Sequence, residues 1–131
     1  MNQPILYDKK DHIATVTMNR PEALNAITVD MIESLADALS DADKDNDVRV
    51  LILTGVGRAF CVGADIKQLK RWGTEPQLRE RFSTRAPAMF HQLQEFRRPI
   101  IAAVNGTAVA GGFELCCLAD VVVCIRRCID W

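Results

Sequence analysis

The chain has 131 residues, which is enough for one domain with a hydrophobic core. Its 16 Lys and Arg residues nearly balance 17 Asp and Glu residues, and aromatic residues make up only 6%. Without a basic stripe or an aromatic stacking surface, nucleic acid is not an expected partner. No apolar run reaches transmembrane length and no signal peptide is visible, so we expect a cytoplasmic protein without a membrane partner.

The first third of the chain predicts a hairpin and a helix. Residues 5–7 and 12–18 have the alternating or β-branched character of strands, and residues 8–11 are the expected loop between them. Thr28 is a candidate N-cap for a helix that has apolar residues at helical spacing as far as about Ala42.

The middle of the chain continues an α/β pattern. Residues 50–53 form a short apolar run typical of a buried parallel strand, and the strand-helix-strand order predicts a right-handed crossover. A turn of small residues, 60–65, then leads into a short helix over 66–69. Pro76 is expected near the start of the next helix, which Pro87 should bend or split.

The segment 105–115 is the main candidate for a functional site. It follows an apolar strand pattern at 100–104, passes through a glycine-rich turn, and enters a helix pattern at 113–119. Helix-start amides suit a negative oxygen, and Glu114 lies in the first turn. Unpaired amides beside one acid could stabilise an enolate while a proton moves, although such junctions are also common in α/β proteins without catalysis.

Two turns, the one at 60–65 and the glycine-rich one within 105–115, follow apolar strands in this pattern. Ligands of α/β sheets gather beyond the carboxyl ends of the strands, so one ligand can meet both turns. The amides of Ala64 and Gly111 can then donate to one carbonyl oxygen as an oxyanion hole.

The cysteines and histidines predict no metal site. The spacing of the cysteines is unlike that of zinc ligands, and we expect Cys116 and Cys117 to be small core residues. His12 and His91 are isolated, which favours structural or surface roles. The five cysteines are Cys61, Cys116, Cys117, Cys124 and Cys128.

Three motifs resemble the enoyl-CoA hydratase/isomerase (crotonase) family: 19–26, 58–66, and 101–106 continued by 111–115. Their order and spacing match over roughly 5–124. The resemblance implies a crotonase-like (ClpP/crotonase) α/β spiral of ββα units. It also implies an acyl-CoA thioester as substrate, no separate cofactor, and hydration of 2-enoyl-CoA in fatty acid or related acyl-CoA catabolism.

The resemblance also implies roles for single residues. The amides of Ala64 and Gly111 match the oxyanion hole, and Glu114 matches a catalytic glutamate of the hydratases. Glu22 departs from the family, because many members have a Lys there near the CoA phosphates. The implied substrate-binding residues are Ala23, Leu24, Val62, Ala64, Asp65, Ile66, Lys67 and Gly111.

The likeness fails after Val123, so we expect 1–123 to be the N-terminal part of one crotonase-like domain and 124–131 an anomalous tail. The second glutamate of hydratases would lie beyond this chain, as would the helices that complete the fold and much of the trimer or hexamer contact. Isomerisation, another family reaction, or a non-catalytic remnant therefore stay open as alternatives. We expect the isolated chain to be a poor enzyme with little hydratase activity, and to be poorly stable and prone to associate.

Overall fold

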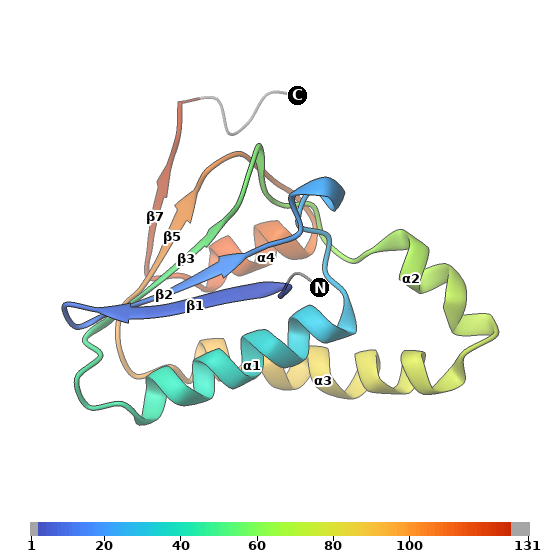
Figure 1. The fold of residues 1–131 in the computed structure, drawn as a ribbon, viewed down its shortest axis with the longest axis horizontal. Helices are drawn as coiled ribbons and strands as arrows, with labels where there is room; N and C mark the ends of the chain where they lie inside the picture. The colour runs from blue at the N-terminus through green and yellow to red at the C-terminus, as the bar shows by residue number, and fades with distance from the viewer. Residues whose placement is uncertain (1–2, 127–131) are drawn as a thin grey trace.

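The computed structural model describes residues 3–126, which form a twisted five-stranded sheet with helices packed against it (Figure 1). The strand order is β1-β2-β3-β5-β7, with β1 antiparallel to β2 and every other pair parallel. The predicted α/β class is confirmed. The strands are β1 (Ile5–Lys10), β2 (Ile13–Met18), β3 (Val50–Gly55), β5 (Ile100–Val104) and β7 (Val121–Cys124).

The hairpin is present, but its turn is shorter than expected. Lys10 pairs with Ile13, so the two-residue loop consists of Asp11 and His12. Both have positive φ, 53° and 67°, as a tight hairpin turn of this length requires. The predicted loop at 8–11 is wrong because Asp8 to Lys10 stay paired with β2.

Three of the helices begin where the sequence predicted, whereas the last begins at Gly111, two residues before the expected start at 113. The Thr28 side chain accepts a hydrogen bond from the Met31 amide at 3.2 Å and caps α1. α3 is not split at Pro87: Pro87 and Ser83 are both exposed, so water can satisfy the backbone group that proline leaves unpaired. The elements are η1 (Pro21–Ala23), α1 (Val29–Lys44), α2 (Ile66–Lys70), η2 (Arg71–Gly73), α3 (Pro76–Gln94) and α4 (Gly111–Leu118).

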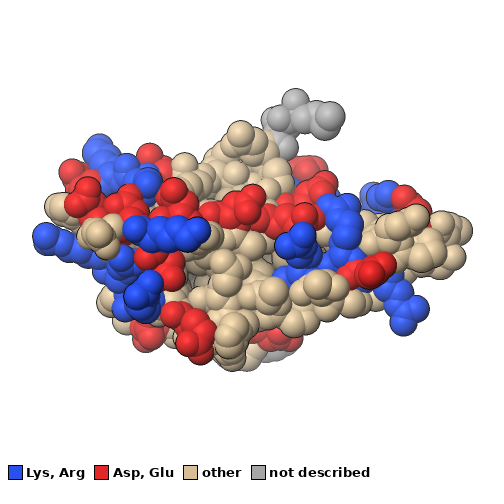
Figure 2. Space-filling model, turned by 90° about the horizontal axis from the view of Figure 1, so that it is seen from below, with Lys and Arg blue, Asp and Glu red and all other residues tan. Residues whose placement is uncertain are grey.

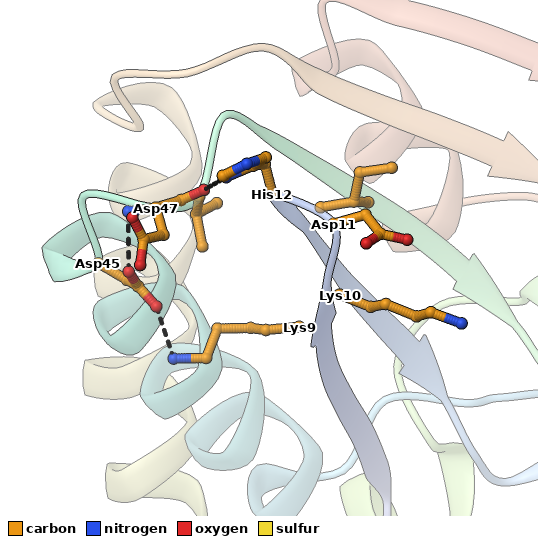
Figure 3. A pocket seen from close by; sticks show the side chains of 8 residues that line it. Lys9, Lys10, Asp11, His12, Asp45 and Asp47 are labelled. Carbon is orange, nitrogen blue, oxygen red and sulfur yellow. Dashed lines mark hydrogen bonds and ion pairs between the residues drawn. The ribbon is translucent and has the colours of Figure 1, made fainter.

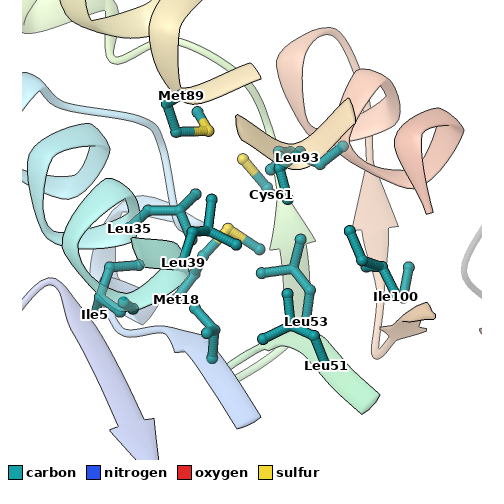
Figure 4. Close-up of a cluster of buried hydrophobic side chains, with 14 of the residues drawn as sticks. Ile5, Met18, Leu35, Leu39, Leu51, Leu53, Cys61, Met89, Leu93 and Ile100 are labelled. Carbon is teal, nitrogen blue, oxygen red and sulfur yellow. The ribbon is translucent and has the colours of Figure 1, made fainter. Parts of the chain in front are cut away.

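The core lies on one face of the sheet. The predicted parallel strand at 50–53 is confirmed; Leu51 and Leu53 are fully buried, whereas Val50 and Ile52 on its other face are half-buried. α1, α3 and α4 all contribute to the cluster against the buried face (Figure 4). Figure 4 labels Ile5, Met18, Leu35, Leu39, Leu51, Leu53, Cys61, Met89, Leu93 and Ile100 in this cluster.

A second, two-stranded parallel sheet of β4 (Ala59–Cys61) and β6 (Thr107–Ala108) continues from β3 and β5. β4 occupies part of the predicted turn at 60–65. At the other end of β5, the Ile100 amide donates to the Asp120 carboxylate at 2.7 Å, so Asp120 anchors backbone just before β7.

The expected burial of two cysteines is only half right. Cys116 is buried as predicted, but Cys117 is exposed because α4 turns that position away from the core. His12 and His91 are at the surface. Cys124, assigned above to the tail, completes β7, whereas Cys128 and the rest of 127–131 lie outside the described residues.

Charge of both signs covers the face where α1 and α3 lie. Figure 2 shows Lys, Arg, Asp and Glu side chains interspersed there, in keeping with the balanced composition. Among residues 3–126, no helix is both long and apolar enough to cross a membrane.

Candidate active site

The two predicted turns leave neighbouring parallel strands. Cys61 at the end of β4 pairs with Ala108 at the end of β6, and the Val109 amide donates to the Cys61 carbonyl at 3.1 Å. Because parallel strands end at the same edge, the segments that follow them begin side by side. The turn that contains Ala64 and the turn that contains Gly111 are thereby brought together.

Glycine allows these turns to touch through their backbones. A Cβ on Gly63 would lie 2.9 Å from the Ala110 Cβ and 3.3 Å from the Gly111 nitrogen. Gly63 also has a φ of +96°, which side chains with L configuration rarely adopt. A larger residue at Gly63 would push the two turns apart.

The amides of Ala64 and Gly111 are free of hydrogen bonds within residues 3–126. Ala64 forms a parallel bridge with Ile27, but its own amide takes no part in the two hydrogen bonds. The Ile27 amide donates to the Gly63 carbonyl, and the Asp65 amide donates to the Ile27 carbonyl. The Ala64 amide therefore points away from that bridge. Gly111 is the first residue of α4, where an amide has no partner inside the helix.

Ala110 holds an unusual backbone conformation immediately before Gly111. Its φ of 50° and ψ of −124° form a combination that non-glycine residues rarely occupy. Such conformations cost about 1–3 kcal/mol and persist when surrounding contacts impose them. Here the amides of Gly112 and Glu114 bond to the carbonyls of Val109 and Ala110, and these bonds fix the start of the helix.

Glu114 is exposed in the first turn of α4, while Leu115 and Cys116 face the core. Within the described residues its carboxylate makes no hydrogen bond or ion pair. Phe113 beside it is 59% exposed, so an acid and an apolar ring share the outer side of the helix start. A carboxylate that is not committed to the fold is available to move a proton.

The residues implied for substrate binding lie on two adjacent segments. Ala23 and Leu24 lie in the connector around η1, and the Ile27–Ala64 bridge joins this connector to the segment with Val62, Ile66 and Lys67. Ile66 is 67% exposed on α2, and Lys67 is exposed next to it. Apolar and cationic groups therefore line the surface beside the Ala64 turn.

Asp65 is committed to the fold. Its carboxylate caps α2 by accepting from the Gln68 amide at 3.0 Å, and it also pairs with the Arg20 guanidinium at 3.0 Å. Burial alone would raise its pKa, but the Gln68 amide and the Arg20 charge outweigh burial and lower the pKa below its ordinary value. The side chain of Asp65 is thus a structural anchor of this turn.

The sequence reasoning missed the structural role of Asn25 and Asn105. Both side chains hold the loop that joins β3 to β4, just before the Ala64 turn. The usable signal was an asparagine in two of the three motifs, Asn25 in 19–26 and Asn105 directly after the predicted strand at 100–104, because asparagine side chains in connecting segments often bond to backbone.

The described part of the chain contains no group of three or more His, Cys, Asp or Glu side chains arranged to hold a metal ion. A depression of about 420 Å³ lies at the other end of the sheet, beside the hairpin turn (Figure 3). Lys9, Asp11, His12, Asp45 and Asp47 are among its lining residues, and the Lys9 ammonium is already paired with Asp45. The depression is therefore separate from the two turns.

Comparison with known proteins places the chain in a family. The family model for enoyl-CoA hydratase/isomerase matches residues 8–129. A short-chain-enoyl-CoA hydratase of Clostridium acetobutylicum is 35% identical over 118 residues, covering 89% of this chain and 44% of that protein. The small ribosomal subunit protein mS47 of Schizosaccharomyces pombe is 37% identical over 117 residues, covering 87% of this chain and 27% of that protein.

The fold agrees with that match. A crystal structure of an enoyl-CoA hydratase/isomerase from Mycobacterium paratuberculosis superposes with a TM-score of 0.87 at 31% identity, covering 95% of this chain and 50% of that one. The chain spans half or less of the length of these relatives. The fold is therefore crotonase-like, and the chain belongs to the enoyl-CoA hydratase/isomerase family.

Proposed function

We propose that this chain carries the carbonyl-binding part of an enoyl-CoA hydratase-like active site. The observation that carries the proposal is the pair of unpaired amides, Ala64 and Gly111, in two turns whose backbones touch. A thioester oxygen between these amides would accept two hydrogen bonds. Donors aimed at developing negative charge are a large source of catalysis in acyl chemistry.

Glu114 is the proposed acid/base. In hydration, the oxygen of water bonds to C3 of a 2-enoyl-CoA, the double-bond electrons move toward the thioester oxygen, and the enolate then takes a proton at C2. Glu114 lies three residues after Gly111 in the same helix turn, and it would exchange the proton with water or with C2.

The CoA portion would lie along the connector and α2. Ala23, Leu24, Val62 and Ile66 offer apolar contact, and the ammonium of Lys67 suits a phosphate. Contact from Asp65 would come from its backbone, because its carboxylate is committed to Arg20 and Gln68. The acyl-CoA is the substrate, and the mechanism calls on no separate cofactor.

The test is the rate of Glu114→Gln, which keeps the shape of the side chain and removes its proton chemistry. In an active, complete form of the protein, we expect hydration, measured as loss of the conjugated-thioester absorbance, to fall by about a hundredfold or more. Glu80→Gln, at an exposed position on α3, is the matched control. Near-normal turnover in Glu114→Gln would remove this residue from the mechanism.

Isomerisation is the second candidate, because it needs only one base. Glu114 would take a proton from C2 of a 3-enoyl-CoA and return it to C4, leaving the double bond at C2. The next carboxylate along the chain, Asp120, is bonded to the Ile100 amide, which favours chemistry with Glu114 alone. Appearance of conjugated-thioester absorbance from a 3-enoyl-CoA, without subsequent hydration, would support this candidate.

A non-catalytic role is the third candidate, and the ribosomal name of one relative supports it. Failure of the purified chain to bind any acyl-CoA thioester would favour it over both reactions. The trimeric or hexameric assembly and the cytoplasmic location stay predictions.

A further inference from the structure

Two asparagine side chains converge on one backbone oxygen upstream of the Ala64 turn. Asn25 Nδ2 donates to the carbonyl of Ala59 at 2.9 Å and to that of Val56 at 3.1 Å. Asn105 Nδ2 donates to the same Ala59 carbonyl at 3.0 Å and to that of Gly57 at 2.8 Å. The loop between β3 and β4 is thus held by side chains from two distant parts of the sequence.

Both side chains also accept through their oxygens. Asn25 Oδ1 receives the Arg20 amide at 2.8 Å, and Asn105 Oδ1 receives the Gly55 amide at 3.2 Å. Each asparagine therefore uses both amide protons and its oxygen. Aspartate cannot replace this pattern, because an ionised carboxylate has no proton to donate and would face carbonyl oxygens.

The asparagines are joined by short segments to the two candidate amides. Two residues after Asn25, Ile27 bonds to Gly63 and Asp65 on either side of Ala64. On the other side, Gly106 follows Asn105, and a Cβ there would lie 2.0 Å from the Arg58 carbonyl oxygen. The backbone that leads to Gly111 therefore rests directly on the loop that both asparagines hold.

We propose that Asn25 and Asn105 are positioning residues that set the placement of the Ala64 and Gly111 amides relative to each other. Asn25 is completely buried, which suits a group that orders backbone and touches no ligand. The catalytic consequence rests on the proposed function, but the placement of the amides does not. A displacement of about 1 Å in such a site can cost roughly a hundredfold in rate.

Asn105→Asp is the test variant, because Asn105 is half-buried and its replacement disturbs the fold less than a change at Asn25. Asn46→Asp, an exposed position in the turn after α1, is the matched control. The first measurement is the amide NMR spectrum of the ligand-free chain. We expect the Ala64 and Gly111 resonances to move in Asn105→Asp, to return toward the wild-type positions as the carboxyl group is protonated, and to stay unmoved in the control.

The second measurement uses a dimethylaminocinnamoyl-CoA thioester, whose absorption moves to longer wavelength when its carbonyl accepts hydrogen bonds. We expect Asn105→Asp to reduce this wavelength shift by a larger factor than it raises the dissociation constant of the thioester. The wavelength shift should recover at low pH, where the introduced carboxyl group is protonated. A merely structural role would lower stability without a pH-dependent change in the bound spectrum.

The outcomes separate this inference from the proposed function. Unmoved Ala64 and Gly111 resonances in a folded Asn105→Asp chain would overturn the positioning role. A wild-type chain that binds the thioester without a wavelength shift would overturn the two amides as donors, and the NMR result would still decide the positioning. If Asn105→Asp does not fold, Asn105→Ser, which keeps one donor, gives the same NMR readout.

Discussion

Gly111 offers a way to remove one proposed donor without breaking an existing hydrogen bond. Its amide is unpaired among residues 3–126, and it occupies the first position of α4, where proline is well accommodated. Gly111→Pro removes this N–H outright, so its effect on turnover reports the donor provided that the fold stays intact.

In an active form of the protein, we expect Gly111→Pro to lower turnover by about a hundredfold to a thousandfold, because one such donor is worth roughly 3 kcal/mol. Proline also restricts the residue before it, and Ala110 already has an unusual conformation, so circular dichroism must show an intact fold. Unchanged turnover with an intact fold would reject Gly111 as a donor.

At the scale of elements, glycine sets how closely α4 approaches β4. A Cβ on Gly112 would lie 2.0 Å from the Cys61 carbonyl oxygen, which belongs to the backbone of a buried strand. Because neither backbone can move without separating the two turns, the contact is a geometric requirement of the candidate site.

We expect Gly112→Ala to lower the free energy of unfolding by about 1–3 kcal/mol, as overpacking does in buried sites. Gly73→Ala is the control, because nothing lies within 4 Å of a Cβ placed there. Urea denaturation of both variants measures the difference. Equal stabilities would show that β4 and α4 adjust to the added methyl group.

The capping of α2 makes stability depend on pH. The folded-state pKa of Asp65 is lowered, so its ionised form stabilises the fold above its unfolded pKa of about 3.9. That contribution is lost as pH falls through the folded-state pKa. Asp65→Asn keeps a capping oxygen but loses the charge that faces Arg20.

We expect Asp65→Asn to destabilise the chain by about 1–3 kcal/mol at pH 7 and by less at pH values below about 4, where the wild-type carboxyl takes up its proton. Asp30→Asn, at an exposed carboxylate in the first turn of α1, should change little. Thermal melts across this pH range measure both. A constant difference between wild type and Asp65→Asn would contradict the assigned ion pair.

At the scale of the whole molecule, the two edges of the sheet differ in chemistry. β1 carries Asp8, Lys9 and Lys10, charges of the kind that discourage pairing with another chain. β7 presents Val121, Val122 and Val123, each about half exposed. An apolar edge with unpaired backbone groups favours association.

We expect the purified chain to bind a hydrophobic dye and to associate as its concentration rises, and Val123→Lys to reduce both. Leu6→Lys, on the edge that already carries charge, is the control and should change neither by as much. Light scattering and dye fluorescence measure the two effects. Equal behaviour of wild type and Val123→Lys would locate the association elsewhere.

Local patterns were sufficient to predict most helix starts and strands. The N-cap Thr28 and the helix start at Pro76 each depend only on neighbours within a few residues. The position of the hairpin turn was predicted wrongly, because the charged segment 8–11 has the composition of a loop. Its first three residues are strand residues only because they pair with β2.

The sequence by itself determined the α/β pattern, the family motifs and the identity of the candidate residues Ala64, Gly111 and Glu114. Only the tertiary structure decided which groups are free and which are committed. The Asp65 carboxylate is bonded to the Arg20 guanidinium and the Gln68 amide, whereas the Ala64 and Gly111 amides have no partner among the described residues. Asn25 and Asn105 both donate to the Ala59 carbonyl, although they are 80 positions apart along the chain. Local sequence patterns could not predict that these two side chains share an acceptor.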